Sequence, residues 1–176
     1  MYRFPFFMFK GREEYMVLLE FAVVSACVWL LYRQKLLFRL NTLVNGLFCL
    51  YLIQMVEGII VSNQKYVVVT HNAWTFLTYL IHLMGTVPCI ALLAIYYAGR
   101  GKDGAGHPAA SSIGVWLAGT IVLTLGEFML ESAGIIRYSR GFHPGASWLF
   151  WAVWLAAVFV WDRLIYLKEA KDVGAC

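Results

Sequence analysis

Apolar residues are concentrated in five long stretches of the chain, and each stretch is bounded by charged residues, glycine or proline. The stretches cover residues at about 16–32, 36–62, 73–98, 112–136 and 146–167. Each is close to or above the length of about 20 residues that a helix needs to cross a hydrocarbon core of about 30 Å. The pattern predicts an all-α fold: an integral membrane bundle of five transmembrane helices, in a single domain over residues 1–176.

The composition strengthens this prediction. Hydrophobic residues make up 61% of the chain and charged residues only 14%, whereas roughly a quarter of the residues in an average soluble domain are charged. The apolar stretches leave no room for a separate soluble domain. The net charge of +4 suits a protein that faces anionic lipid. We therefore expect the lipid bilayer as a partner and no binding of nucleic acid.

Lysine and arginine are distributed unevenly between the two predicted sides of the membrane. With the N-terminus outside, eight of the 14 Lys and Arg residues lie inside and six lie outside. Because cytoplasmic loops carry an excess of these residues, the bias predicts an N-terminus outside and a C-terminus inside.

Two segments of the chain share a short pattern. QMVEGIIVSNQKY and FMLESAGIIRYSRGF each place an acid shortly before Gly-Ile-Ile, and then leave the apolar stretch through serine and a cation. Each segment is followed by a stretch that contains tryptophan. The pattern predicts one helix followed by two repeated hairpins, and many transport folds are built from such repeats.

Two of the predicted helices carry a face of polar and small residues. These residues are Thr120, Thr124, Glu127, Glu131, Gly134 and Tyr138 on one helix, and His71, Thr75, Thr78, His82, Gly85 and Cys89 on the other. Their spacing of three and four residues places each set on one helical face. An ionisable group that faces lipid costs several kcal/mol. The two faces are therefore expected to turn toward each other or toward a shared polar cavity.

The depth of each ionisable side chain follows from the helical rise per residue. Glu127 and His82 are expected about 14 Å and about 12 Å below one membrane surface, near the midplane. Glu131, Glu57 and Glu20 are expected about 6–8 Å below the same surface. The predicted ion, proton or ligand site consists of Glu127, His82, Glu131, Glu57, Thr78 and Thr124, and its rim of Arg137, Arg140, His71 and Glu20.

Three interpretations of this site stay open. In the first, Glu127 is a deep carboxylate with His82 as its partner in proton- or cation-linked transport or sensing. In the second, the groups are structural: Glu131 pairs with a nearby arginine, and Glu127 forms hydrogen bonds with Thr78 or His82. The chain would then be a non-catalytic membrane subunit or anchor that packs against partner chains or a second copy of itself. In the third, the site binds a lipid or small ligand, or belongs to a membrane-embedded enzyme.

No motif assigns a reaction to these residues. The sequence lacks a Glu-x-x-His pair, an HExxH motif, a nucleophilic triad and a phosphate-binding loop. Cys27, Cys49 and Cys89 lie inside apolar stretches, where cysteine acts as a small hydrophobic residue. His107 and His143 each precede a proline, which is typical of a helix start. We therefore predict no catalytic residue, no metal and no cofactor, and favour a protein that is not an enzyme.

The segment from Glu131 to Ser147 resembles a group of small multi-pass membrane proteins of uncharacterised function from spore-forming bacteria. The resemblance rests on an acid, Gly-Ile-Ile, Tyr138, an aromatic–glycine turn and a helix that starts with Ser-Trp. It extends to the proline within the stretch 73–98 and to the basic loop after it, and it does not extend to Trp161-Asp162-Arg163. It implies a multi-pass protein of a bacterial plasma membrane and the number of helices, and it implies no chemistry.

Overall fold

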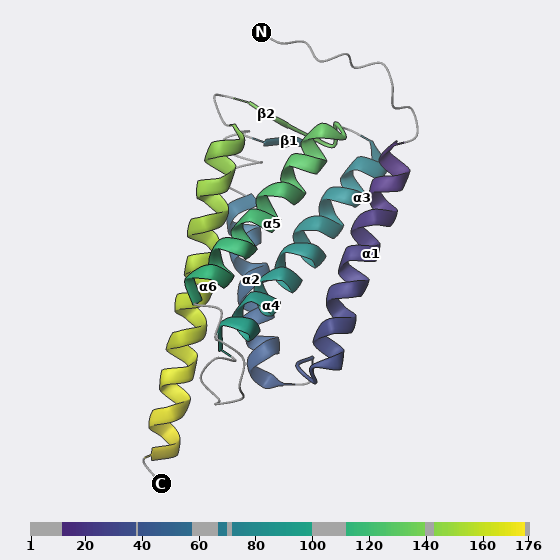
Figure 1. The fold of residues 1–176 in the computed structure, drawn as a ribbon. Coiled ribbons are helices and arrows are strands. Elements are labelled where there is room, and N and C mark those ends of the chain that lie inside the picture. The colour runs from purple at the N-terminus through teal and green to yellow at the C-terminus, as the bar shows by residue number, and fades with distance from the viewer. Residues whose placement is uncertain are drawn as a thin grey trace.

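The computed structural model describes residues 12–37, 39–57, 67–69, 72–99, 112–139 and 143–174. Most of these residues are helical. The helices are α1 (Arg12–Arg33), α2 (Leu40–Glu57), α3 (Ala73–Ile81), η2 (His82–Thr86), α4 (Val87–Gly99), α5 (Ser112–Ser132) and α6 (Pro144–Gly174). Since α3, η2 and α4 follow one another without a break, the described residues form five continuous helices. They lie side by side in one bundle (Figure 1), and the predicted all-α fold is confirmed.

Four of the helices in the described part of the chain are long and apolar enough to cross a membrane. These segments are Glu14–Arg33, Ala73–Ala98, Ser112–Ser132 and Gly145–Ile165, and a shorter apolar helix covers Leu40–Met55. Large apolar side chains lie on the outside of the bundle, where Phe21, Phe128 and Val153 are each at least half exposed. A soluble bundle would turn such side chains toward its core, so this surface suits an apolar solvent.

The helix that begins at Ala73 changes its winding in the middle. Asn72 caps its first turn, since the Asn72 side chain accepts a hydrogen bond from the backbone N–H of Trp74. Further along, Pro88 has no N–H to donate to the carbonyl of Met84. The five residues before Val87 form a π-helix, in which the N–H of Val87 donates to the carbonyl of His82. Such π segments are rare and are often found at functional sites.

The end of α5 differs from the prediction. The helix was expected to continue to Ile136, but it ends at Ser132. Gly134 adopts a left-handed φ of 77°, and the N–H groups of Gly134 and Ile135 donate to the carbonyls of Glu131 and Leu130. This is the Schellman arrangement that ends many helices at glycine.

The bounds of the other helices also differ from the predicted ones. Helix α1 begins at Arg12, about one turn before the predicted start, and α2 begins at Leu40 instead of residue 36. Residues 58–62 of the predicted second helix lie outside the described residues. The start of α6 follows the predicted histidine–proline signal, since Nδ1 of His143 accepts a hydrogen bond from the N–H of Gly145.

A two-stranded ribbon, which the hydrophobic pattern did not predict, closes one end of the bundle. Strand β1 (Val67–Val69) lies between α2 and α3, and strand β2 (Ile136–Tyr138) lies between α5 and α6. The strands are antiparallel, with Val67 opposite Tyr138. Figure 1 shows the ribbon at the end of the bundle where α6 begins and opposite the turn between α1 and α2. The ribbon therefore joins the connection between α2 and α3 to the connection between α5 and α6.

The core lies where α4, α5 and α6 meet, and α1 packs against the outer side of α3, η2 and α4. Leu123 of α5, Leu155 of α6 and Val87 of α4 are fully buried. The approach of α1 is close at Gly85, where an added Cβ would lie 2.8 Å from Cγ2 of Val24. This packing brings the middle of α1 against the π segment.

Candidate functional site

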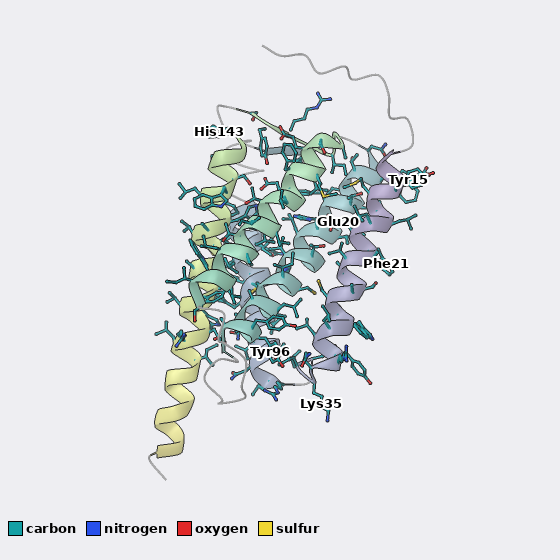
Figure 2. The ribbon with its side chains drawn as sticks, viewed as in Figure 1. Tyr15, Glu20, Phe21, Lys35, Tyr96 and His143 are labelled. Carbon is teal, nitrogen blue, oxygen red and sulfur yellow. The ribbon has the colours of Figure 1, made fainter. Side chains whose placement is uncertain are left out.

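His82, the first residue of the π segment, lies in the interior of the bundle with 1% of its surface exposed. Its Nδ1 lies 2.9 Å from Oε1 of Glu20 on α1. The second carboxylate oxygen of Glu20 accepts a hydrogen bond of 2.5 Å from the hydroxyl of Thr86. In Figure 2, Glu20 points from α1 toward the other helices, whereas the neighbouring Phe21 points outward. We call the three buried residues Glu20, His82 and Thr86 the Glu20 cluster.

The sequence explains why this cluster forms. Glu20 lies in an apolar helix, and a buried carboxylate is stable only when nearby donors replace its water. The π segment supplies both donors, His82 at its start and Thr86 at its end. Because α1 begins at Arg12, Glu20 lies about 12 Å along its helix, and His82 lies about 14 Å from the start of α3. The prediction that Glu20 belongs to the rim is therefore wrong.

The other ring nitrogen of His82, Nε2, is buried and forms no hydrogen bond with any residue that the structure describes. When Glu20 is ionised, the ring hydrogen lies on Nδ1 and points at the carboxylate, so Nε2 keeps its lone pair. The arrangement is a base held in one orientation by an acid, with its basic nitrogen inside the bundle.

Glu127 of α5 belongs to a second cluster, and its partners come from α6. Its Oε2 accepts a hydrogen bond from the hydroxyl of Ser147, and another of 2.6 Å from the indole N–H of Trp151. Ser147 is fully buried and Trp151 is 4% exposed. The phenol of Tyr138 on β2 faces the same carboxylate: burial, and then the charge of Glu127, raise the pKa of Tyr138 above its ordinary value. These four residues form the Glu127 cluster.

The partners predicted for Glu127 are wrong. His82 is bonded to Glu20, and the hydroxyl of Thr78 donates to the carbonyl of Trp74 in its own helix. Thr124 donates in the same way to the carbonyl of Thr120. A threonine in a helix readily bonds to the carbonyl four residues earlier, so these hydroxyls are not available to the acids.

The position of Glu127 along its helix also differs from the prediction. Because α5 ends at Ser132, Glu127 lies about 8 Å from the helix end instead of about 14 Å.

Gly126 brings the two clusters next to each other. A Cβ added to Gly126 would lie 2.9 Å from Cε1 and 3.7 Å from Nε2 of His82. The Cε1 edge of the imidazole, between its two nitrogens, therefore packs against the backbone of α5, one residue before Glu127. A side chain at position 126 would occupy the space of the ring.

The remaining predicted site residues lie at the ribbon end of the bundle or outside the described residues. Glu131 is partly exposed in the last turn of α5. Arg137 is exposed on β2. Glu57 is the last residue of α2, and its side chain is outside the described part. His71 and Arg140 also lie outside the described residues.

A metal site would need several ligands close together. Within the described ranges, no three side chains of His, Cys, Asp or Glu come together. The Glu20 cluster offers one imidazole and one carboxylate, a set that suits the exchange of a proton.

Sequence reasoning missed Thr86, Ser147 and Trp151 as partners of the acids. Trp148, Trp151 and Trp154 recur every three residues, a spacing that indicates packing and not acid binding. The structure buries Trp151 and Trp154 and leaves Trp148 40% exposed. A lone acid such as Glu20 within an apolar helix is a signal that a donor lies opposite it, but it does not say on which helix.

Comparisons with known protein families, with curated proteins and with solved structures find no match to this chain. The resemblance to membrane proteins of spore-forming bacteria stays a prediction.

Proposed function

We propose that this protein crosses a bacterial plasma membrane with five helices and binds a proton at the Glu20 cluster, in proton-linked transport or sensing. Four helices of suitable length and hydropathy support the membrane location. The 18 residues of α2 extend about 27 Å, close to the hydrocarbon thickness of about 30 Å. The outside N-terminus and inside C-terminus stay predictions of the lysine and arginine count.

The observation that carries the proposal is the unpartnered Nε2 of His82 in a side chain that is 1% exposed. A histidine with a purely structural role gains stability when both ring nitrogens are bonded, because a buried polar atom without a partner is costly. A proton-binding histidine needs one nitrogen with a free lone pair. Glu20 supplies the negative charge that stabilises the imidazolium after the proton arrives. Glu127, the residue after Gly126 on α5, is the second carboxylate of the proposed site.

The burial of the polar faces favours the proposed proton site over the alternative of a membrane subunit that binds a partner chain through these faces. A subunit of that kind would expose the polar face of α5 on the outside of the bundle. Thr120 of that face is fully buried, Glu127 is 9% exposed, and Thr78 on the facing helix is fully buried. These side chains are not accessible to another chain.

The topology also supports the proposed repeat of two hairpins. Helix α2 leads through β1 to α3, and α5 leads through β2 to α6. The two strands pair with each other in antiparallel orientation, as the equivalent parts of two repeats do around a twofold axis. Helix α1 is then the single extra helix, and it contributes Glu20 to the site.

The test is proton flux into lipid vesicles that contain the purified protein, with a pH-sensitive dye inside and the membrane potential held at zero. The variants are Glu20→Gln and His82→Gln, and the control is Glu14→Gln, which changes an exposed carboxylate on the same helix as Glu20. We expect wild type and the control to dissipate a pH gradient faster than empty vesicles, and both site variants to match empty vesicles. Wild-type flux at the level of empty vesicles, or site variants as active as wild type, would overturn the proposal.

A further inference from the structure

A second buried polar contact lies between α2 and α6. Nδ2 of Asn45 donates a hydrogen bond of 2.7 Å to Oδ1 of Asp162. Asn45 is 3% exposed, and Asp162 is partly buried. On α6, Asp162 follows Ser147 by 15 residues, which corresponds to about 22 Å along the helix. The contact therefore lies toward the opposite end of the bundle from the Glu127 cluster.

The amide of Asn45 has an acceptor that its contact with Asp162 does not use. Its Oδ1 is buried and has no partner among the described residues. An ionised Asp162 can only accept, and the N–H of Asn45 meets that need. A protonated Asp162 has an O–H that must donate. A rotation of the Asn45 side-chain amide that exchanges the positions of Nδ2 and Oδ1 would present Oδ1 as the acceptor. The same amide can thus bond to either protonation state of the acid.

Two aromatic rings stack on each other in the same interface between α2 and α6. Phe48, one helical turn after Asn45, stacks on Trp161 with 4.2 Å between the ring centroids. The indole Nε1 of Trp161 is buried and has no partner in the described part of the chain. Two unpartnered polar atoms, one acceptor and one donor, therefore belong to residues of the same small interface. Polar atoms of this kind are where ordered water binds inside proteins.

In the described part of the chain, the helices that pack against α6 carry few charged residues. Arg163, which follows Asp162 on α6, is exposed. The helices that pack against α6 are α2, α4 and α5. Helix α2 has one charged residue, Glu57 at its far end, and α4 has none. The charged residues of α5 are Glu127 and Glu131, near the ribbon end. The amide of Asn45 is the polar group of α2 that donates a hydrogen bond of 2.7 Å to the acid. Asp162, and Asn41 one turn before Asn45, each have a further interaction.

We propose that Asp162, with Asn45 as its partner, is a second proton-binding site, toward the end of the bundle opposite the ribbon. This inference rests on the proposed proton-linked function, because it assigns the point at which a proton enters or leaves on the other side. The proton comes from a hydronium ion: an O–H bond forms on the carboxylate of Asp162, one O–H bond of hydronium breaks, and water remains. The carboxylate loses its charge, and the acid then donates to Oδ1 of Asn45.

Infrared difference spectroscopy of the protein in phosphatidylcholine vesicles, between neutral and acidic pH, tests the site. Wild type and the Glu14→Gln control are expected to gain a band of a protonated carboxyl group that Asp162→Asn lacks. Asn45→Leu is expected to shift the frequency of this band, because the protonated acid then lacks the Oδ1 acceptor of Asn45. A spectrum of Asp162→Asn identical to that of wild type would overturn the inference. Asp162→Asn keeps the shape of the side chain, so it decides the matter even where Asn45→Leu does not fold.

Proton flux in the same vesicles separates this inference from the proposed function. We expect Asp162→Asn and Glu20→Gln each to reduce the flux to the level of empty vesicles. Flux that is lost in Glu20→Gln and retained in Asp162→Asn would overturn the second site and leave the first intact. Wild-type flux no greater than that of empty vesicles would overturn the proposed function, and the infrared band alone would then decide whether Asp162 binds a proton.

Discussion

Replacement of Gly126 by alanine tests whether the imidazole of His82 is held in one position. The added Cβ would lie 2.9 Å from Cε1 of the ring, whereas ordinary van der Waals contact begins at 3.4 Å. The ring would have to retreat by about 0.5–1 Å, and its Nδ1 is bonded to Glu20 at 2.9 Å. Overpacking of this kind costs about 1–3 kcal/mol.

A matched control removes the effect of helix propensity. Replacing glycine by alanine inside a helix contributes about 0.5–1 kcal/mol of stability by itself. Gly46 of α2 lies in a helix too, and a Cβ there would be 3.8 Å from Cδ1 of Leu92, an ordinary contact. The free energies of unfolding of Gly126→Ala and Gly46→Ala are therefore expected to differ by about 1–3 kcal/mol.

The assay is denaturant unfolding in detergent micelles, followed by circular dichroism. The Gly126→Ala substitution is measured in wild type and in a His82→Ala background. If the clash is with the ring, the cost of the added methyl group disappears when the ring is absent. An equal cost in both backgrounds would refute the reasoning, because the methyl group would then be meeting something other than His82.

The remaining predictions concern the other hydrogen bonds of the two acids. Thr86→Val removes the donor of the 2.5 Å bond to Glu20 and is expected to lower the free energy of unfolding by about 1.5–3 kcal/mol; an unchanged unfolding midpoint would contradict it. Ser147→Ala removes a donor to Glu127 and is expected to cost about 1–3 kcal/mol in the same assay. Burial, and then Glu127, raise the pKa of Tyr138 above its ordinary value of 10.0. The folded state favours the neutral phenol, so the free energy of unfolding should fall as the pH rises above about 10, and the tyrosinate absorbance that Tyr138→Phe removes should appear only above that pH.

The helices could be predicted from the sequence because length and hydropathy are local properties. Their exact ends depend on short-range details that hydropathy does not contain. The first turn of α1 is polar, with charged residues from Arg12 to Glu14, and hydropathy places the start about one turn later. With the later start, Glu20 was expected only about 6 Å from the helix end. This shorter distance placed Glu20 at the rim of the predicted site.

The pairing of the acids could not be predicted, because it depends on which helices become neighbours. The sequence suggested His82 and Glu127 as partners, because each lies on a polar face of its helix. Glu20 has no polar stripe around it, yet α1 packs directly against the π segment. Glu20 therefore reaches His82, and Glu127 is satisfied by the hydroxyl of Ser147 from α6.

The ribbon and the π segment show a similar limit. Three valines at 67–69 and the Ile136–Tyr138 segment are too short to predict strands by themselves, and each becomes a strand only because the other lies beside it. Pro88 does indicate an interrupted helix, since its ring removes one backbone hydrogen bond. It does not specify that the interruption takes the form of a π-helix that begins at His82.

The central claim is that Glu20 holds His82 so that Nε2 is the nitrogen that accepts a proton. Nitrogen-15 NMR of the histidine-labelled protein in lipid vesicles, with the His82 signals identified by their loss in His82→Gln, measures this directly. We expect hydrogen on Nδ1 and a bare Nε2 at neutral pH, and a second hydrogen on Nε2 after acidification. Hydrogen on Nε2 at neutral pH, with Nδ1 bare, would contradict the account.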